Sequence, residues 1–132
     1  DKYPRRVRVS DDHVRRTYPK VVFSQGLRQR LLDQVATWQA EGIQVVAFRP
    51  PAAPHLEALE MQPSYYPEAA LKAQLEGLGA IWLDLPDRAR YETYDGNHLV
   101  ARSARQLSAD LGRLLRQALD APRPLLQQKQ DF

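Results

Sequence analysis

The sequence contains no cysteine, only six glycines and no long hydrophobic run. Without cysteine the chain cannot form disulfides, a thiolate zinc site or a cysteine nucleophile. The glycines do not form a phosphate-binding loop after any β-favouring segment, which argues against nucleotide binding. No apolar segment is long enough to cross a bilayer, and the chain opens at Asp1 with neither a signal segment nor a lipidation motif. We expect any targeting element or membrane anchor to lie upstream or to have been removed.

The 132 residues fit a single domain, although a complete doubly wound α/β enzyme commonly needs more strands than this chain offers. The net charge of +3 is uneven, because residues 1–20 hold seven basic and three acidic side chains. Such a basic arm could bind an anionic partner through released counterions. Because aromatic residues that could stack on bases are limited to Tyr3 and Tyr18, we expect a solvated arm rather than nucleic-acid binding.

The hydrophobic pattern predicts helices and strands that alternate along the chain. In order, the predicted elements are a helix from Leu27 to about Gly42, a strand over 43–48, a loop over 49–66, a helix from Pro67 to Gly79, a strand over 80–85, and a helix over 101–119. This order predicts parallel strands joined by right-handed crossovers. The predicted fold is α/β, a three-layer flavodoxin-like parallel sheet with flanking helices that is incomplete in this chain. The predicted divisions are a basic irregular lead-in over 1–26, the α/β domain over 27–121 and a polar tail over 122–132.

The loop after the second predicted strand carries an acid and a histidine in the segment Asp95-Gly96-Asn97-His98-Leu99. In open α/β sheets, functional residues collect in loops that leave the carboxyl ends of the strands. A carboxylate three residues before a histidine can fix the imidazole tautomer and stabilise the imidazolium that forms during proton abstraction. The structural alternative is a helix-entry turn in which Asp95 caps backbone amides and His98 is a solvated surface residue.

Three segments in this order resemble the C-terminal portion of the SGNH (GDSL-like) hydrolase and acyltransferase superfamily. They are Gly-Ile-Gln-Val-Val-Ala-Phe-Arg-Pro-Pro, Gly-Ala-Ile-Trp-Leu-Asp-Leu and Asp-Gly-Asn-His-Leu ahead of a final amphipathic helix, within about 27–119. The chain is most similar to a bacterial envelope branch that includes D-alanyl-transfer and alginate O-acetylation proteins. The resemblance implies that His98 is a general base and Asp95 its orienting carboxylate.

Other blocks of that superfamily have no convincing match in this sequence. The Gly-Asp-Ser nucleophile block and the Gly and Asn oxyanion-hole blocks are missing, so we expect the nucleophilic serine upstream of Asp1, in the N-terminal half of the same domain. Ser24 stands ahead of a helix like a nucleophile turn, but that helix precedes the Arg-Pro-Pro strand. Val100 replaces a helix-capping Ser or Asn, and Ser103 stands where a small glycine is usual.

The resemblance implies a serine esterase or O-acyltransferase that acts on an acyl ester or glycan and is inactive as this chain alone. It also implies a periplasmic or other extracytoplasmic location, with a membrane anchor upstream. The alternative is a non-catalytic α/β module that binds an anionic polysaccharide or nucleic acid through the basic arm or the 49–66 loop.

Arg49 ends the first predicted strand, where it could direct a cation toward a substrate or an oxyanion. Its structural alternative is an ion pair with a local carboxylate such as Glu57 or Glu60. We expect no cofactor. We also expect no metal, because His13 beside Asp11 and Asp12 has no further ligand at helical or turn spacing.

Overall fold

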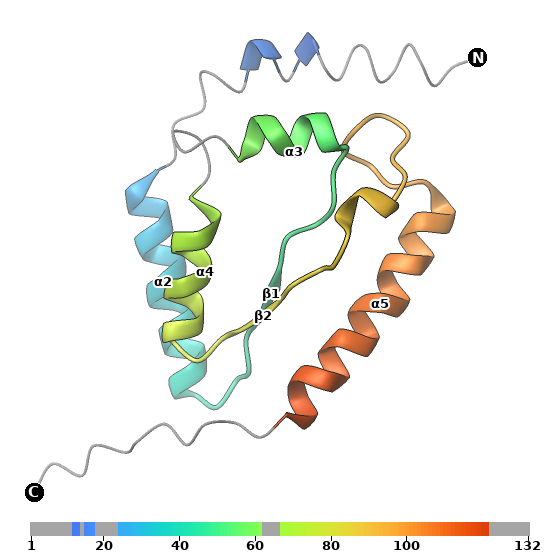
Figure 1. Cartoon of the computed structure of the whole chain (residues 1–132). Helices are drawn as coiled ribbons and strands as arrows, with labels where there is room; N and C mark the ends of the chain where they lie inside the picture. The colour runs from blue at the N-terminus through green and yellow to red at the C-terminus, as the bar shows by residue number, and fades with distance from the viewer. Residues whose placement is uncertain (1–11, 14, 18–23, 62–66, 122–132) are drawn as a thin grey trace, which may run out of the picture.

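The computed structural model describes residues 12–13, 15–17, 24–61 and 67–121. The elements are α2 (Gln25–Ala40), β1 (Val46–Phe48), α3 (Pro54–Glu60), α4 (Glu68–Gly77), β2 (Ile81–Leu83), the 3₁₀ helix η2 (Arg88–Arg90) and α5 (Ala101–Asp120), as Figure 1 shows. The predicted α/β class is confirmed. Most of the predicted lead-in over 1–26 and all but the first residue after α5 lie outside the described residues.

The two strands pair in parallel, with Val46 opposite Ile81 and Phe48 opposite Leu83. Both strands fall inside the predicted ranges, but each has only three residues. The sheet formed by the described residues contains these two strands alone, in the order β1–β2. Their carboxyl ends therefore meet at one edge, from which the chain leaves toward α3 and toward η2.

The predicted loop over 49–66 is wrong in part, because α3 occupies Pro54–Glu60 within it. Proline suits the first turn of a helix, since its missing N–H would have no helical partner there. Leu56 is 0% exposed and packs with Ala52 and Leu59. This short helix was missed because a single buried leucine gives too little periodicity to predict a helix of seven residues.

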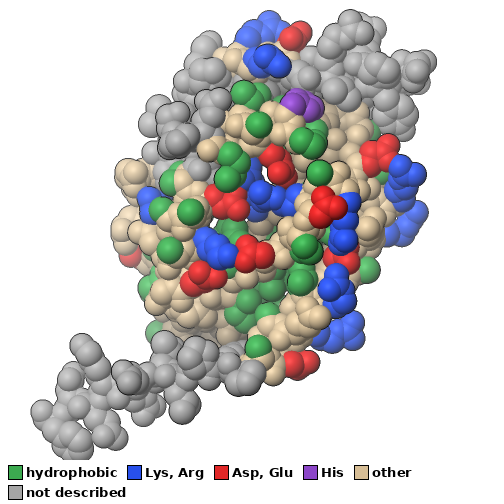
Figure 2. Space-filling model, viewed as in Figure 1, with side chains coloured by type: hydrophobic (Ala, Val, Ile, Leu, Met, Phe, Trp, Pro, Cys, Tyr) green, Lys and Arg blue, Asp and Glu red, His purple; other side chains and the backbone are tan. Residues whose placement is uncertain are grey.

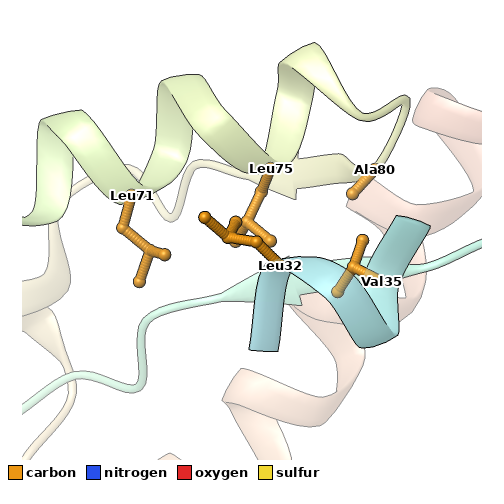
Figure 3. Close-up of a cluster of buried hydrophobic side chains, with 5 residues drawn as sticks. All are labelled: Leu32, Val35, Leu71, Leu75 and Ala80. Carbon is orange, nitrogen blue, oxygen red and sulfur yellow. The ribbon is translucent and has the colours of Figure 1, made fainter. Parts of the chain in front are cut away.

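The main core lies between α2, α4 and one face of the sheet. Its buried members are Leu32, Val35, Leu71, Leu75 and Ala80, which point toward one another in Figure 3. Ala47 and Trp82 of the strands pack against this cluster. Burying each leucine stabilises the fold by about 1.5 to 3 kcal/mol before entropic costs. Burial of this shared face explains why the two helices lie side by side.

Helix α5 lies on the other side of the strands from α2 and α4 (Figure 1). Its first half is anchored, because Ser103 and Leu107 are buried. Farther along, the apolar stripe is only half-buried, and Leu119 is exposed. Among the described helices, none has the length and apolar character required to cross a membrane.

Candidate functional site

The segment between η2 and α5 doubles back on itself and presents a tight turn at its tip. Thr93 and Leu99 form an isolated antiparallel bridge. One residue closer to the tip, the Tyr94 N–H donates to the His98 carbonyl over 3.0 Å. These backbone contacts bring the two sides of the turn together and hold Asp95 beside His98.

Asp95 uses its two carboxylate oxygens for different purposes. Oδ1 accepts hydrogen bonds from the backbone N–H groups of Asn97 and His98, at 3.0 and 2.8 Å. Oδ2 lies 2.7 Å from His98 Nδ1. Burial opposes ionisation of Asp95, but the hydrogen bonds from His98 and Asn97 outweigh it and lower the pKa of this carboxyl. The capping role and the histidine-orienting role therefore coexist in one side chain.

Gly96 fits the turn tightly against the start of α3. Its φ of +96° lies in the region that glycine adopts without strain. The Gly96 carbonyl accepts a 2.8 Å hydrogen bond from the Ala53 N–H, and a Cβ at Gly96 would lie 2.7 Å from Leu56 Cδ1. A side chain at position 96 would strain the backbone and collide with the buried Leu56, so the close approach of the turn to α3 depends on glycine.

The imidazole of His98 lies at the surface, with 68% of its side chain exposed. Its Nδ1 faces an ionised carboxylate, which favours the tautomer that carries hydrogen on Nδ1. The ring of Tyr94 stacks on the imidazole, with 5.7 Å between centroids and 21° between planes. Hydrogen on Nδ1 leaves the lone pair on Nε2, the nitrogen that proton abstraction would use.

The base of the loop is tied to α5 through the Ser103 side chain and the Val100 backbone. The buried Ser103 accepts a 2.9 Å hydrogen bond from the Glu92 N–H through its Oγ. Val100 occupies the N-cap of α5 and gives no side-chain cap, and its own N–H donates to the Glu92 carbonyl. In this chain Ser103 thus stabilises the loop through a contact that glycine could not make.

A second contact to α5 was not anticipated from the sequence. Tyr91 is 2% exposed, and its hydroxyl donates to Asp110 Oδ2 over 2.9 Å. Burial raises the pKa of Tyr91, while hydrogen bonds from Arg113 and Tyr91 lower the pKa of Asp110. Arg90 also pairs with Asp110. Tyr91 and Asp110 are 19 positions apart in the sequence, so no local motif reveals this pair.

Arg49 lies at the end of β1, in a group of charged residues that we term the strand-end cluster: Arg49, Glu57, Glu60, Glu68 and Arg88. Arg49 pairs with Glu60 at 2.6 Å and also with Glu68, and its side chain is only 9% exposed. Burial opposes its charge, but both glutamates outweigh burial and raise the pKa of Arg49. The pairing considered with Glu60 is therefore present, and the further partner comes from α4.

Arg88 belongs to the same cluster but lies in η2, the 3₁₀ helix that follows β2. It lies 3.4 Å from Glu57 and 3.7 Å from Glu68. Glu57 Oε1 also accepts a hydrogen bond from the Ala52 N–H. A polar pocket of about 130 Å³ opens beside these groups, and its lining includes Arg49, Glu68, Asp84 and Arg88. Figure 2 shows side chains of both charges gathered on this face.

Ser24 caps α2, where its Oγ accepts a 3.2 Å hydrogen bond from the Leu27 N–H. Figure 1 places the start of α2 and the loop that carries Asp95 and His98 near opposite ends of α3. The structure thus brings Asp95 and His98 together but places Ser24 elsewhere. Arg49 belongs to the strand-end cluster rather than to the turn.

Comparison with protein-family models, curated proteins and solved structures gave no significant match.

The geometry of the turn provides an oriented, accessible imidazole, the arrangement a general base needs. Among the described residues, no three metal-ligating side chains gather closely enough to hold an ion. Sequence reasoning missed Tyr94, although its position four residues before His98 across a glycine turn could have suggested a cross-strand neighbour. It also missed the contact with Leu56, because that contact depends on a helix that was not predicted.

Proposed function

We propose that this chain supplies the acid-histidine pair of an SGNH-like serine esterase or O-acyltransferase. The observation that carries the proposal is the 2.7 Å contact between Asp95 Oδ2 and His98 Nδ1 on an imidazole that is 68% exposed. The resemblance of the surrounding segments to that superfamily gives the class of reaction. The nucleophilic serine would come from polypeptide upstream of Asp1.

In the proposed reaction, His98 Nε2 takes the proton from the serine hydroxyl as its oxygen attacks the acyl carbonyl. Asp95 stabilises the resulting imidazolium through Nδ1. The imidazolium then returns the proton to the departing alkoxide, which leaves an acyl-serine. Water or a sugar hydroxyl, deprotonated by the same nitrogen, then attacks the acyl group, and the imidazolium returns that proton to the serine oxygen as the acyl–serine bond breaks. An ester or a glycan is therefore the proposed substrate.

The sheet supports the finer proposal that a three-layer flavodoxin-like domain is completed by upstream sequence. Parallel sheets are generally covered on both faces and contain more than two strands. Here β1 pairs on one side only among the described residues, and Phe48 within it is 37% exposed. Figure 2 shows hydrophobic side chains exposed between α4 and α5. Further strands would cover these apolar groups.

The envelope branch that the chain resembles adds the proposal of a periplasmic, membrane-anchored protein.

The first test measures p-nitrophenol release from acyl esters by the purified 132-residue chain. We expect no release above the buffer blank, because the proposed nucleophile is missing. Turnover that survives Ser24→Ala would contradict the proposal.

The second test uses the full-length polypeptide that contains this chain. His98→Ala should lower kcat by about 10⁴- to 10⁶-fold, and Asp95→Asn by about 10³- to 10⁴-fold. The matched control is His55→Ala, which removes an exposed imidazole near the turn, on α3, and should leave kcat within about twofold. Activity that persists after His98→Ala would exclude His98 as the base.

A further inference from the structure

Tyr94 is the side chain whose position best suits it to support the His98 imidazole. One carboxylate oxygen of Asp95 contacts one nitrogen of the imidazole, 2.7 Å away. A single hydrogen bond leaves a ring that is 68% exposed able to turn away into solvent. The orientation that the proposed reaction needs therefore calls for a second contact.

Tyr94 supplies a contact of the required shape. Its ring and the imidazole are nearly parallel, at 21°, with centroids 5.7 Å apart. Stacking at this centroid distance is one of the arrangements that aromatic pairs prefer. The backbone that carries Tyr94 is fixed, because its N–H donates to the His98 carbonyl and the adjacent Thr93 bridges Leu99. The same backbone contacts therefore hold both Tyr94 and His98 in place.

We propose that Tyr94 is a positioning residue, whose ring holds the His98 imidazole with Nδ1 toward Asp95 and Nε2 toward the surface. The ring face, rather than the hydroxyl, makes this contact. Phenylalanine should therefore replace tyrosine, whereas an aliphatic residue should not. The orientation itself is a property of this chain, and its catalytic consequence rests on the proposed function.

The experiment follows the His98 ring by NMR in the chain as it stands. The ¹⁵N shifts of both ring nitrogens report the tautomer, side-chain couplings report the rotamer, and the ring protons report stacking through upfield shifts. In the wild-type protein we expect those upfield shifts and a population dominated by hydrogen on Nδ1. Ring protons without upfield shifts would overturn the proposal before any variant is made.

Two variants and one control complete the test. Tyr94→Leu, and Tyr94→Val as a second variant that favours extended backbone, should abolish the upfield shifts. They should also lower the ratio of the Asp95-facing orientation to the others by about two- to tenfold, as expected from aromatic pair energies. Tyr94→Phe should retain both the upfield shifts and the wild-type orientation ratio. Equal losses in Tyr94→Phe and Tyr94→Leu, or an unchanged orientation ratio in both aliphatic variants, would overturn the proposal.

A kinetic measurement in the full-length polypeptide separates this inference from the proposed function. Tyr94→Leu should lower kcat in proportion to the measured fall in the Asp95-facing population, by at most about tenfold and with KM unchanged, whereas Tyr94→Phe should retain the wild-type kcat. If His98→Ala leaves activity intact, the proposed function fails while the NMR result still decides the role of Tyr94. If His98→Ala abolishes activity but the aliphatic variants leave kcat unchanged, the positioning role fails and the proposed function stands.

Discussion

The Asp95–His98 turn leaves its imidazole 68% exposed, whereas the strand-end cluster keeps the Arg49 side chain only 9% exposed. Both regions follow the carboxyl ends of the two strands. In the cluster, Arg49 meets two carboxylates and Arg88 two, with Glu68 shared between them. In the turn, one carboxylate serves two backbone N–H groups and one imidazole nitrogen.

The two regions differ in which groups their charged side chains bind through hydrogen bonds and ion pairs. Mutual pairing of charges in the cluster offsets the cost of removing them from water and joins α3, α4 and η2. The turn instead uses both carboxylate oxygens of Asp95 within the loop and leaves 68% of the His98 side chain exposed. A group that must exchange a proton with a substrate has to remain accessible. The cluster therefore has the features of a structural element, whereas the turn keeps exposed the imidazole on which the proposed function depends.

The largest effect should come from Arg49→Met in the cluster. This change leaves Glu60 and Glu68 half-buried without their shared cation, and we expect it to lower the free energy of unfolding by about 2 to 4 kcal/mol. Urea denaturation at neutral pH measures the loss.

The matched control for Arg49 is Lys72→Met, which breaks the pair between Lys72 and the 71% exposed Asp84. That change should leave the unfolding midpoint within experimental error, because exposed pairs contribute little. In addition, Arg49→Met combined with Glu68→Gln should lose less than the sum of the single changes. Equal losses for Arg49 and Lys72 would remove the structural distinction drawn for the cluster.

A smaller effect is expected from Gly96→Ala in the turn. A Cβ there meets Leu56 Cδ1 at 2.7 Å, and the φ of +96° strains any L-residue. We expect a loss of about 1 to 3 kcal/mol in unfolding free energy. Gly112→Ala is the control, because nothing lies within 4 Å of its Cβ and alanine favours the helix by about 1 kcal/mol. If both substitutions stabilise the protein, the turn is not held by α3 as described.

The smallest effect should come from Asp95→Asn, and it should depend on pH. The pKa of Asp95 is lowered in the folded state, so its carboxylate stabilises the fold above the unfolded value of about 4. That contribution is lost as the pH falls through the lower folded value. We expect Asp95→Asn to cost about 1 kcal/mol at pH 7, with the gap from wild type closing toward pH 2. A gap that stays constant over this range would show that the charge of Asp95 is not responsible.

Sequence patterns were sufficient where a contact lies within one element or one turn. The helical spacing of apolar residues predicted α2, α4 and α5, and the β-favouring runs predicted both strands to within a few residues. The spacing of Asp95 and His98 also predicted their contact, because two side chains three residues apart around a glycine turn lie close together. These features depend on local geometry, which a sequence encodes directly.

Contacts between distant elements could not be predicted in the same way. The partners of Arg49 were open between Glu57 and Glu60, and the structure adds Glu68 because α4 packs beside the strand end. Helix α3 and the contact between Leu56 and Gly96 depend on packing that no periodicity records. By itself, the sequence determined the α/β class and the acid-histidine pair. Only the tertiary structure decided which charges are neutralised and how far the His98 imidazole is exposed, because both depend on what each side chain meets across the fold.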